Sequence, residues 1–239
     1  MTARPPRLTL FAALVLGIGV GGVAAAQQAV GHAPGLRAIG RYTLAGDKHF
    51  IHGYEPVDPD GAAHVVVEIP TGTSQKWETD KASGRLVWEV EDGAPRMVAY
   101  LGYPGNYGMI PRTLLPKKQG GDGDPLDVLV LGPAVPRGSV VPARVIGVLR
   151  MVDRGERDDK LIAVLADSCF GKVTTLEELQ KQFPGAAQIV ETWFTNYKGP
   201  GKMQSRGYAD ADQAQALLDA AIEAYRVNEA AAEQSAVGR

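Results

Sequence analysis

The amino-acid sequence predicts an α+β protein that is mainly β, a small β-barrel with helices packed outside it. Short β-branched runs fill the middle of the chain, whereas helical patterns appear only towards its end. Many strands followed by a few helices are typical of a closed sheet covered by helices. The 239 residues, 45% hydrophobic and 22% charged, have an ordinary globular composition with room for one large domain, which we place at residues 64–239.

Residues 65–69, Val-Val-Val-Glu-Ile, form the first clear strand pattern, which stops at Pro70. Residues 76–79 and 86–90 resemble a pair of strands joined through a turn at Ser83-Gly84. Further β-branched runs predict strands over residues 128–131, 140–148 and 161–165.

Helical signals come late in the chain. Thr175-x-x-Glu178 is a capping box, and it opens a segment that ends before Pro184. A second helix is expected because apolar residues recur at spacings of three and four, namely Ile189, Val190, Trp193, Phe194 and Tyr197. Asp210 or Asp212 is placed to cap a last helix, after which we expect a frayed tail rich in Ala and Glu.

The N-terminus has the form of a secretory signal peptide over residues 1–26. Arg4 and Arg7 precede an uncharged apolar run, and Ala24-Ala25-Ala26 supplies the small residues of a cleavage site. The signal predicts export to the periplasm, with no stable membrane span after cleavage. An uncleaved membrane anchor is the alternative, since the run approaches the length of a span. Residues 27–63 are rich in Gly, Pro and polar residues, and we interpret them as an extended arm with a short hairpin.

Several function classes are disfavoured by the composition. The formal net charge is −2, so a broad basic surface for nucleic acid is not expected. The single cysteine, Cys169, excludes an intramolecular disulfide, and we expect it to be a buried apolar residue and not a nucleophile. The sequence contains neither the P-loop pattern of nucleotide-binding enzymes nor the Gly-x-Ser-x-Gly pattern of hydrolases.

The most informative segment is Gly120-Gly121-Asp122-Gly123-Asp124-Pro125-Leu126-Asp127, which places three carboxylates within six residues at the start of an apolar strand. Like charges this close repel one another unless a cation or protons hold them together. Carboxylate oxygens suit Mg²⁺, Ca²⁺ or Mn²⁺, and all four histidines precede residue 65, so zinc is not expected here. A solvated acidic turn is the alternative. An EF-hand is excluded, because Asp127 and Pro133 stand where it needs Gly and Glu.

A second acidic segment, residues 153–160, puts Asp153 and Asp158 on either side of a predicted hairpin tip. Alone it is most often a charged surface turn, but beside the first cluster it would complete a site for more than one metal ion. Basic and phenolic residues are spread along the chain at Lys76, Arg96, Lys160, Lys198, Lys202, Tyr103, Tyr107 and Tyr197. Divalent metals with such donors suit a small, highly charged anion such as phosphate, and they indicate hydrolysis by metal-activated water.

The segment Asp-Gly-Asp-Pro-Leu-Asp-Val at residues 122–128 resembles the signature of the family I soluble inorganic pyrophosphatases. Further blocks of that family occur in its order and together span residues 64–202: Glu68-Ile69-Pro70, Lys76-x-Glu78, Tyr103-Pro104-x-Asn106-Tyr107-Gly108, Asp153-x4-Asp158-x-Lys160 and Tyr197-Lys198. The resemblance implies an OB-like five-stranded β-barrel with flanking α-helices. It also implies hydrolysis of pyrophosphate to two phosphates with several Mg²⁺ ions per site, for which Mn²⁺ could substitute.

The same resemblance implies a role for each site residue. Asp124 is expected to act as general base toward the attacking water. The expected metal ligands are Asp122, Asp127, Asp153 and Asp158. The groups expected to bind phosphoryl oxygens are Lys76, Arg96, Tyr107, Lys160, Tyr197 and Lys198. Supporting roles are expected for Glu68, Glu78 and Tyr103. Asp159 stands beside Asp158 as a rival ligand, and only the spacing to Lys160 favours Asp158.

Two other functions stay open at this point. A non-catalytic envelope module that binds divalent metal and polyanions would keep the barrel without turnover, although it has little use for a carboxylate at Asp124. The enzymatic alternative is a broader phosphohydrolase acting on nucleotides or polyphosphate. If several donors converge on both phosphates of pyrophosphate, little room is left for an organic substituent, which disfavours this alternative. Bacterial relatives are commonly hexamers, so the resemblance implies a homo-oligomer.

Overall fold

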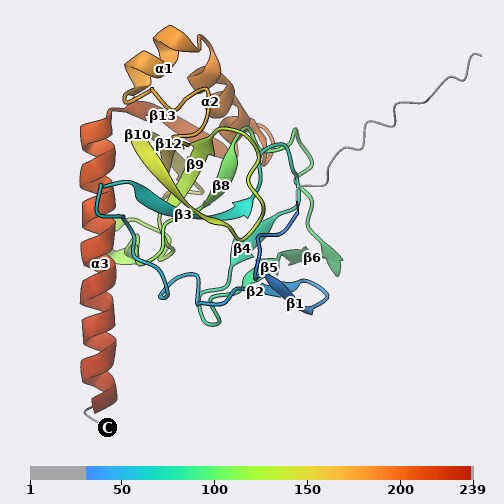
Figure 1. The fold of residues 1–239 in the computed structure, drawn as a ribbon, viewed down its shortest axis with the longest axis vertical. Coiled ribbons are helices and arrows are strands. Elements are labelled where there is room, and N and C mark those ends of the chain that lie inside the picture. The colour runs from blue at the N-terminus through green and yellow to red at the C-terminus, as the bar shows by residue number, and fades with distance from the viewer. Residues whose placement is uncertain (1–30, 238–239) are drawn as a thin grey trace, which may run out of the picture.

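Five strands close into a barrel in the computed structural model, which describes residues 31–237 (Figure 1). In order around the ring they are β3 (Ala63–Ile69), β8 (Asn106–Met109), β9 (Asp127–Leu131), β12 (Lys160–Val164) and β10 (Val140–Asp153). Each strand pairs with the next, and β10 pairs back onto β3 to complete the ring. Of these pairs, β9 with β12 is parallel and the others are antiparallel. The closed ring confirms the small β-barrel that the sequence predicts and the five strands that the family resemblance implies.

Strands β9 and β12 are buried on both faces, which explains their continuous apolar sequence. Leu129 and Ile162 belong to a core shared with the helices α1 (Leu176–Gln182) and α2 (Ala186–Asn196). Val128 and Leu161 belong to a second core shared with α3 (Ala211–Val237). Figure 1 shows this arrangement, with α1 and α2 at one end of the barrel and α3 along its side.

Strand β10 is longer than the sequence predicts, because it changes partner along its length. It pairs with β3, then with β12, and then with β13 (Met203–Ala209) and β11 (Glu156–Arg157). Register shifts lie next to Gly147 and Arg150, and such irregularities bend a strand. The other predicted barrel strands agree with the observed bounds to within two residues.

A second sheet lies beside the barrel in the order β1 (Arg37–Gly40), β2 (Thr43–Ala45), β5 (Leu86–Trp88) and β4 (Trp77–Thr79). The antiparallel pairing of β4 with β5 confirms that predicted pair. The β1–β2 hairpin comes from the predicted arm and joins the sheet through β5. A short ribbon, β6 (Val90–Glu91) with β7 (Ala94–Pro95), and a 3₁₀ turn, η1 (Lys117–Gln119), complete the elements. The predicted signal peptide, residues 1–26, lies outside the described residues.

The caps of the helices agree with the sequence, with differences in detail. The Thr175 hydroxyl accepts a hydrogen bond from the Glu178 amide at 3.1 Å, whereas the Glu178 carboxylate turns back to Thr174. Asp210, and not Asp212, caps α3 by accepting from the Gln213 amide at 2.9 Å. The helix then continues to Val237, where we expected a frayed tail, because Ala and Glu favour helix.

Two predictions about single side chains are wrong. Ile189 is 63% exposed, although the apolar spacing assigns it to the buried face of α2. It lies about 100° around the helix from the buried Val190, at the margin of that face. Cys169 is exposed, although we expected it to be buried. It follows β12 in a turn, where its neighbour Phe170 packs against Phe183 instead, with ring centroids 4.5 Å apart.

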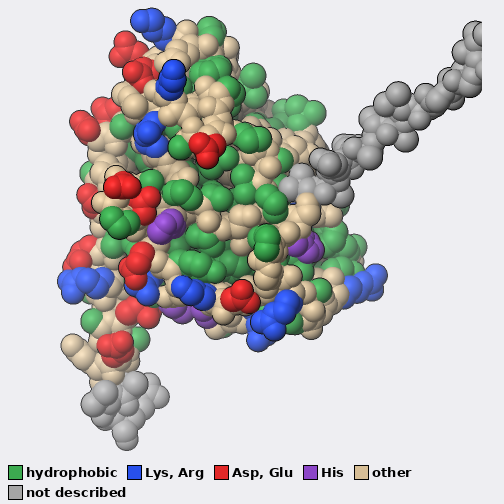
Figure 2. All heavy atoms as spheres, viewed as in Figure 1, with side chains coloured by type: hydrophobic (Ala, Val, Ile, Leu, Met, Phe, Trp, Pro, Cys, Tyr) green, Lys and Arg blue, Asp and Glu red, His purple; other side chains and the backbone are tan. Residues whose placement is uncertain are grey.

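The surface carries both signs of charge. On the face drawn in Figure 2, acidic and basic side chains are interspersed around exposed apolar ones. Across residues 31–237, no helix has both the length and the apolar character that a membrane span requires.

Candidate active site

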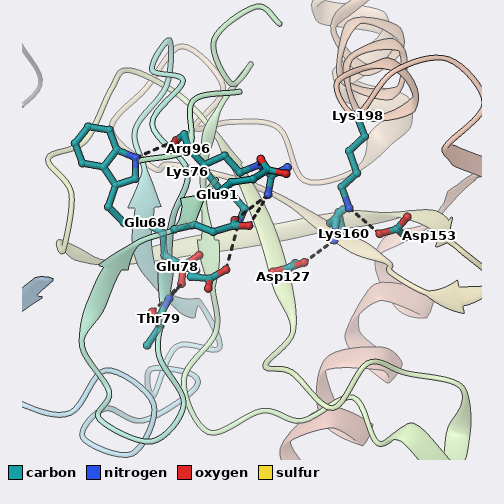
Figure 3. Close-up of polar contacts among 12 residues, drawn as sticks. Glu68, Lys76, Glu78, Thr79, Glu91, Arg96, Asp127, Asp153, Lys160 and Lys198 are labelled. Atoms are coloured by element: carbon teal, nitrogen blue, oxygen red, sulfur yellow. Dashed lines mark hydrogen bonds and ion pairs between the residues drawn. The ribbon is translucent and has the colours of Figure 1, made fainter. Parts of the chain in front are cut away.

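One cavity of about 370 Å³ brings all fourteen predicted site residues together. It opens between the barrel and the segments around β4 and β7, and Figure 3 shows side chains from both sides directed into it. The fourteen residues are Glu68, Lys76, Glu78, Arg96, Tyr103, Tyr107, Asp122, Asp124, Asp127, Asp153, Asp158, Lys160, Tyr197 and Lys198.

The parallel register of β9 and β12 sets the centre of the cavity. Asp127 begins β9 directly opposite Lys160, which begins β12. The Lys160 ammonium donates to Asp127 Oδ2 at 2.5 Å and also to Asp158, and its side chain is 2% exposed. Burial alone would lower the pKa of Lys160, but the two carboxylates raise it overall, so the ammonium keeps its charge.

The acidic loop before β9 is held by its own backbone. Asp122 Oδ1 accepts a hydrogen bond from the Asp124 amide at 2.9 Å, which forms an Asx turn. Gly123 lies inside that turn at a φ of 83°, a conformation that side-chain-bearing residues rarely adopt. The Leu115 amide donates to the Asp124 carbonyl at 2.8 Å and ties the loop to the preceding segment. Burial raises the pKa of Asp122, although the Asp124 amide favours its charged form.

The β10–β11 hairpin presents a further carboxylate. Asp153 ends β10, and the Lys198 ammonium donates to its Oδ2 at 2.7 Å. The Oδ1 atom of Asp153 is buried and has no hydrogen-bond partner in the described part of the chain. A buried carboxylate oxygen is almost always paired, so this atom is a candidate ligand for a cation.

Asp158, and not its neighbour Asp159, lines the cavity. Asp159 is buried, and its carboxylate accepts hydrogen bonds from the Met151 amide at 3.0 Å and from Arg157 Nε at 2.6 Å. The carboxylate oxygens of Asp159 therefore stabilise the β10–β11 hairpin, whereas Asp158 accepts a hydrogen bond from Lys160 in the cavity.

On the opposite side, Glu68 and β4 form the wall. Glu68 Oε1 accepts hydrogen bonds from the amide and the hydroxyl of Thr79, both at 2.7 Å. Burial raises the pKa of Glu68 from 4.5 to about 7, although Lys76 and Thr79 favour its charged form. Lys76 Nζ lies 3.8 Å from Glu78 Oε2.

Arg96 reaches the cavity from the segment after β7 (Figure 3). Its Nη1 donates to the two carboxylate oxygens of Glu89 at 2.9 and 2.8 Å, and its Nε lies 3.4 Å from Glu91 Oε2. Trp88 Nε1 donates to the Arg96 carbonyl at 2.9 Å. These contacts hold the guanidinium at the cavity wall.

The three cavity tyrosines, Tyr103, Tyr107 and Tyr197, pack against aromatic side chains of α2. The rings of Trp193 and Tyr197 are stacked at 4.6 Å, and the Tyr103 ring lies 4.2 Å from that of Trp193. Burial raises the pKa of Tyr103, Tyr107 and Tyr197, so each phenol keeps its proton and can donate a hydrogen bond to an anion.

Sequence reasoning missed other residues of the cavity lining, namely Thr79, Asp80, Lys81, Met109, Pro125, Glu156 and Arg157. Lys81 bears most directly on the chemistry, because its ammonium contacts the Asp124 carboxylate and lies 3.3 Å from the Gly123 carbonyl. No local signal marks this lysine in the sequence, because its contact joins residues that are 43 positions apart.

Of the aspartates expected to act as the base or as metal ligands, most pair with a lysine side chain. Asp124 pairs with Lys81, Asp153 with Lys198, and both Asp127 and Asp158 with Lys160. Within residues 31–237, no three Asp, Glu, His or Cys side chains converge closely enough to hold a metal ion. A cation entering the cavity would therefore compete with these ammonium groups for carboxylate oxygens.

Comparison with known proteins agrees with this site. A family model described as Pyrophosphatase, inorganic pyrophosphatase, matches residues 65–226. The inorganic pyrophosphatase of Nostoc sp. is 36% identical over 179 residues, which cover 72% of this chain and 96% of that protein. The soluble inorganic pyrophosphatase of Zea mays is 39% identical over 167 residues, covering 68% and 71%.

Solved structures give the same result. The inorganic pyrophosphatase of Helicobacter pylori matches with a TM-score of 0.61 and 34% identity, covering 72% of this chain and 98% of that one. The type I inorganic pyrophosphatase of Toxoplasma gondii matches with a TM-score of 0.71 and 26% identity, covering 76% and 90%. With the family match, these likenesses show that the chain belongs to the soluble inorganic pyrophosphatases.

Proposed function

We propose that this chain hydrolyses inorganic pyrophosphate to two phosphates, with Mg²⁺ in the cavity and Asp124 as the general base. The observation that carries the proposal is the single cavity in which all the predicted aspartates, cations and phenols meet. Carboxylates suit divalent metal ions, and the cations and phenols suit the charge of a small phosphate anion. Few other chemistries need both sets at one place.

The chemistry of the donors fits divalent cations, which would have to displace the lysine ammonium groups that pair with these carboxylates. Asp153 Oδ1 is a buried oxygen without a partner, and burial raises the pKa of Asp122 and Asp158, so added positive charge would stabilise their charged forms. We assign Asp122, Asp127, Asp153 and Asp158 as ligands of several Mg²⁺ ions, for which Mn²⁺ could substitute. The chemistry that such ions supply is a lower pKa for water and neutralisation of charge on phosphoryl oxygens.

Asp124 is the carboxylate best placed to take a proton. Its side chain is about half exposed and pairs with Lys81, and it lies between the assigned ligands Asp122 and Asp127 in the same loop. In the proposed step, the water oxygen attacks one phosphorus and its proton passes to an Asp124 oxygen. The bridging P–O bond then breaks, and the second phosphate leaves with the electron pair.

The cations and phenols hold both phosphates. Lys76, Arg96, Lys160 and Lys198 line the cavity and neutralise charge that grows on the leaving phosphate. Tyr107 and Tyr197 keep their protons because burial raises their pKa, so they donate hydrogen bonds to phosphoryl oxygens. Uncatalysed phosphate chemistry is slow enough that the site must lower the barrier by on the order of 20 kcal/mol. Fixed positions for all these groups supply part of that reduction.

We further propose that the protein is exported and assembles with copies of itself. Export rests on the signal-like sequence of residues 1–26, and the periplasm is the expected destination. The homo-oligomer, expected to be a hexamer, rests on the family resemblance. Mass spectrometry of the protein recovered from cells tests the first point, because cleavage predicts an N-terminus at Gln27. Light scattering of the same sample tests the second.

Phosphate release by the purified protein tests the proposed function. With Mg²⁺, rapid release from pyrophosphate that chelation abolishes is the expected result. ATP and tripolyphosphate, offered at the same concentration, are expected to react much more slowly, and equal rates would favour a broader phosphohydrolase. Folded protein that binds pyrophosphate but releases no phosphate with any divalent ion would instead identify a non-catalytic binding module.

A further inference from the structure

A buried arginine lies behind the cavity, outside the set of residues that the proposed chemistry uses. Arg137 precedes β10 and is 4% exposed. Among residues 31–237 no carboxylate forms an ion pair with it, and burial lowers its pKa to about 10, which still leaves it charged at neutral pH. Burying a charge without an opposite charge costs free energy, so the contacts that it does make are informative.

Those contacts lie on two residues of the cavity wall. Arg137 Nε donates to the Glu68 carbonyl at 2.8 Å, and the guanidinium carbon lies 4.7 Å from the centre of the Trp77 ring. Glu68 lines the cavity itself. Trp77 stands between Lys76 and Glu78 in the sequence. Side chains alternate along a strand, so when the Trp77 ring packs into the core, the side chains of its two neighbours point the other way, into the cavity. Figure 3 shows Glu68, Lys76 and Glu78 together at this wall.

The orientation of Trp77 depends on ring contacts. Its indole N–H is buried and has no hydrogen-bond partner in the described part of the chain. The ring stacks on Trp88, with centroids 5.4 Å apart and an interplanar angle of 26°, and Arg137 lies over it. Loss of the guanidinium therefore removes one of the contacts that set the ring plane.

The N-terminal arm covers the backbone of the same arginine. The Ala33 amide donates to the Arg137 carbonyl at 2.8 Å, and the Arg137 amide donates to the Gly31 carbonyl at 3.2 Å. Leu36 packs over the adjacent Gly138, where an added Cβ would come within 2.7 Å of Leu36 Cδ2. The arm and the cavity wall thus meet at residues 137–138.

We propose that Arg137 is a positioning residue, which links the docked N-terminal arm to the wall formed by Glu68, Lys76 and Glu78. It touches no reacting atom and acts by holding the Glu68 backbone and the Trp77 ring. The activity readout of this proposal rests on the proposed function. Small displacements of catalytic groups lower turnover strongly, so we expect loss of the contact to slow hydrolysis by about tenfold.

The test compares full-length Arg137→Met and Arg137→Lys with Arg144→Met, which removes an arginine bonded to the Gly171 carbonyl elsewhere on the barrel. Turnover number, KM for pyrophosphate and the near-ultraviolet circular dichroism of the stacked Trp77–Trp88 pair are measured well below the unfolding temperature of each variant. We expect Arg137→Met to lose about tenfold in turnover and to alter the tryptophan signal. Arg137→Lys should recover part of both, and Arg144→Met should change neither.

An arm variant keeps the test decisive if Arg137→Met does not fold. Leu36→Ala leaves Arg137 in place and should shift turnover and the tryptophan signal in the same direction by less, whereas Ile39→Ala, on the exposed side of the arm, should shift neither. Wild-type turnover and a wild-type tryptophan signal in folded Arg137→Met would overturn the proposal, as would lost turnover with an unchanged tryptophan signal. If the wild-type protein hydrolyses nothing, the proposed function fails, and the dichroism still tests the contact between Arg137 and Trp77.

Discussion

The two walls of the cavity are built in different ways. The barrel wall consists of Asp127, Asp153, Asp158 and Lys160, which stand on or beside the strands of the closed ring. Glu68 of β3 joins this wall to the opposite one, because its carboxylate accepts hydrogen bonds from Thr79 of β4. The outer wall consists of Lys76, Glu78, Lys81 and Arg96, which stand on or beside the short strands β4 and β7. At the barrel wall Lys160 is buried, whereas at the outer wall the side chains of Glu78 and Lys81 are 52% and 58% exposed.

Because of this difference, the two walls should contribute differently to the stability of the fold and to catalysis. Charges of the barrel wall are removed from water and depend on one another, so each is tied to the stability of the fold. In the outer wall, Glu78 and Lys81 keep much of their hydration, and the partly buried Lys76 pairs with the half-exposed Glu78 at 3.8 Å, so these charges contribute little to folding. Substitutions in the barrel wall should therefore lower stability and activity together, and substitutions in the outer wall should lower activity alone.

The largest combined effect is expected from Lys160→Met. The substitution leaves the carboxylates of Asp127 and Asp158 facing each other without their shared ammonium. Breaking such a buried arrangement costs about 3–5 kcal/mol of unfolding free energy. We expect denaturant titration to show that loss and phosphate release to fall to background. Retained stability would mean that the barrel wall is no more tied to the fold than the outer wall.

A smaller and pH-dependent effect is expected at Glu68. Its pKa in the folded protein, about 7, lies above its ordinary 4.5, so the folded state holds a proton that the unfolded chain releases in this interval. The stability from this protonation is fully present below pH 4.5 and is lost as the pH rises through 7, by about 1.4 kcal/mol per pH unit.

In the Glu68→Gln variant the side chain carries no charge at any pH, so the variant should not show that loss of stability as the pH rises. Measured without metal, the variant should match the wild type near pH 4.5 and exceed its unfolding free energy by up to about 3 kcal/mol above pH 7. Parallel curves for the two proteins across this range would show that Glu68 ionises as freely as an exposed carboxylate.

The smallest effect on the fold is expected from Lys76→Met in the outer wall. Its own side chain is 17% exposed, but its nearest acid lies 3.8 Å away and is half exposed, so the lost ion pair is weak and the unfolding free energy should change by less than about 1 kcal/mol. Loss of one cation from the anion site should nevertheless lower kcat/KM by about ten- to a hundredfold. Unfolding curves and steady-state kinetics on one preparation measure both. A stability loss as large as that of Lys160→Met would remove the distinction between the walls.

The sequence was sufficient for most of the barrel strands, although it did not predict β8, and the family resemblance identified fourteen of the residues that line the cavity. The β-branched runs predict β3, β9 and β12 because each is buried, and the acidic loop is local enough to be seen as one motif. The order of the strands around the ring could not be predicted from local patterns, because it depends on pairings between distant segments. The match of Asp127 with Lys160, 33 residues apart, is a product of the parallel register that no local pattern contains.

Lys81 and Asp159 show the same limit at single residues. Lys81 meets Asp124 across 43 positions only after β4 and β5 have paired, so its sequence neighbours give no sign of the contact. Asp159 and Asp158 are adjacent acids with equivalent chemistry, and the hairpin decides which one turns inward to the Met151 amide. Ile189 fails for a related reason, because periodicity defines a helical face but not its width.

The most direct test of the account compares Asp124→Asn with Glu156→Gln, another carboxylate-to-amide change at the same cavity, in saturating Mg²⁺. Both variants are nearly isosteric, and Glu156 has no assigned role. We predict that turnover of pyrophosphate falls by about a thousandfold or more in Asp124→Asn and stays within about twofold of wild type in Glu156→Gln. Near-wild-type turnover by folded Asp124→Asn would contradict the assignment of Asp124 as the base.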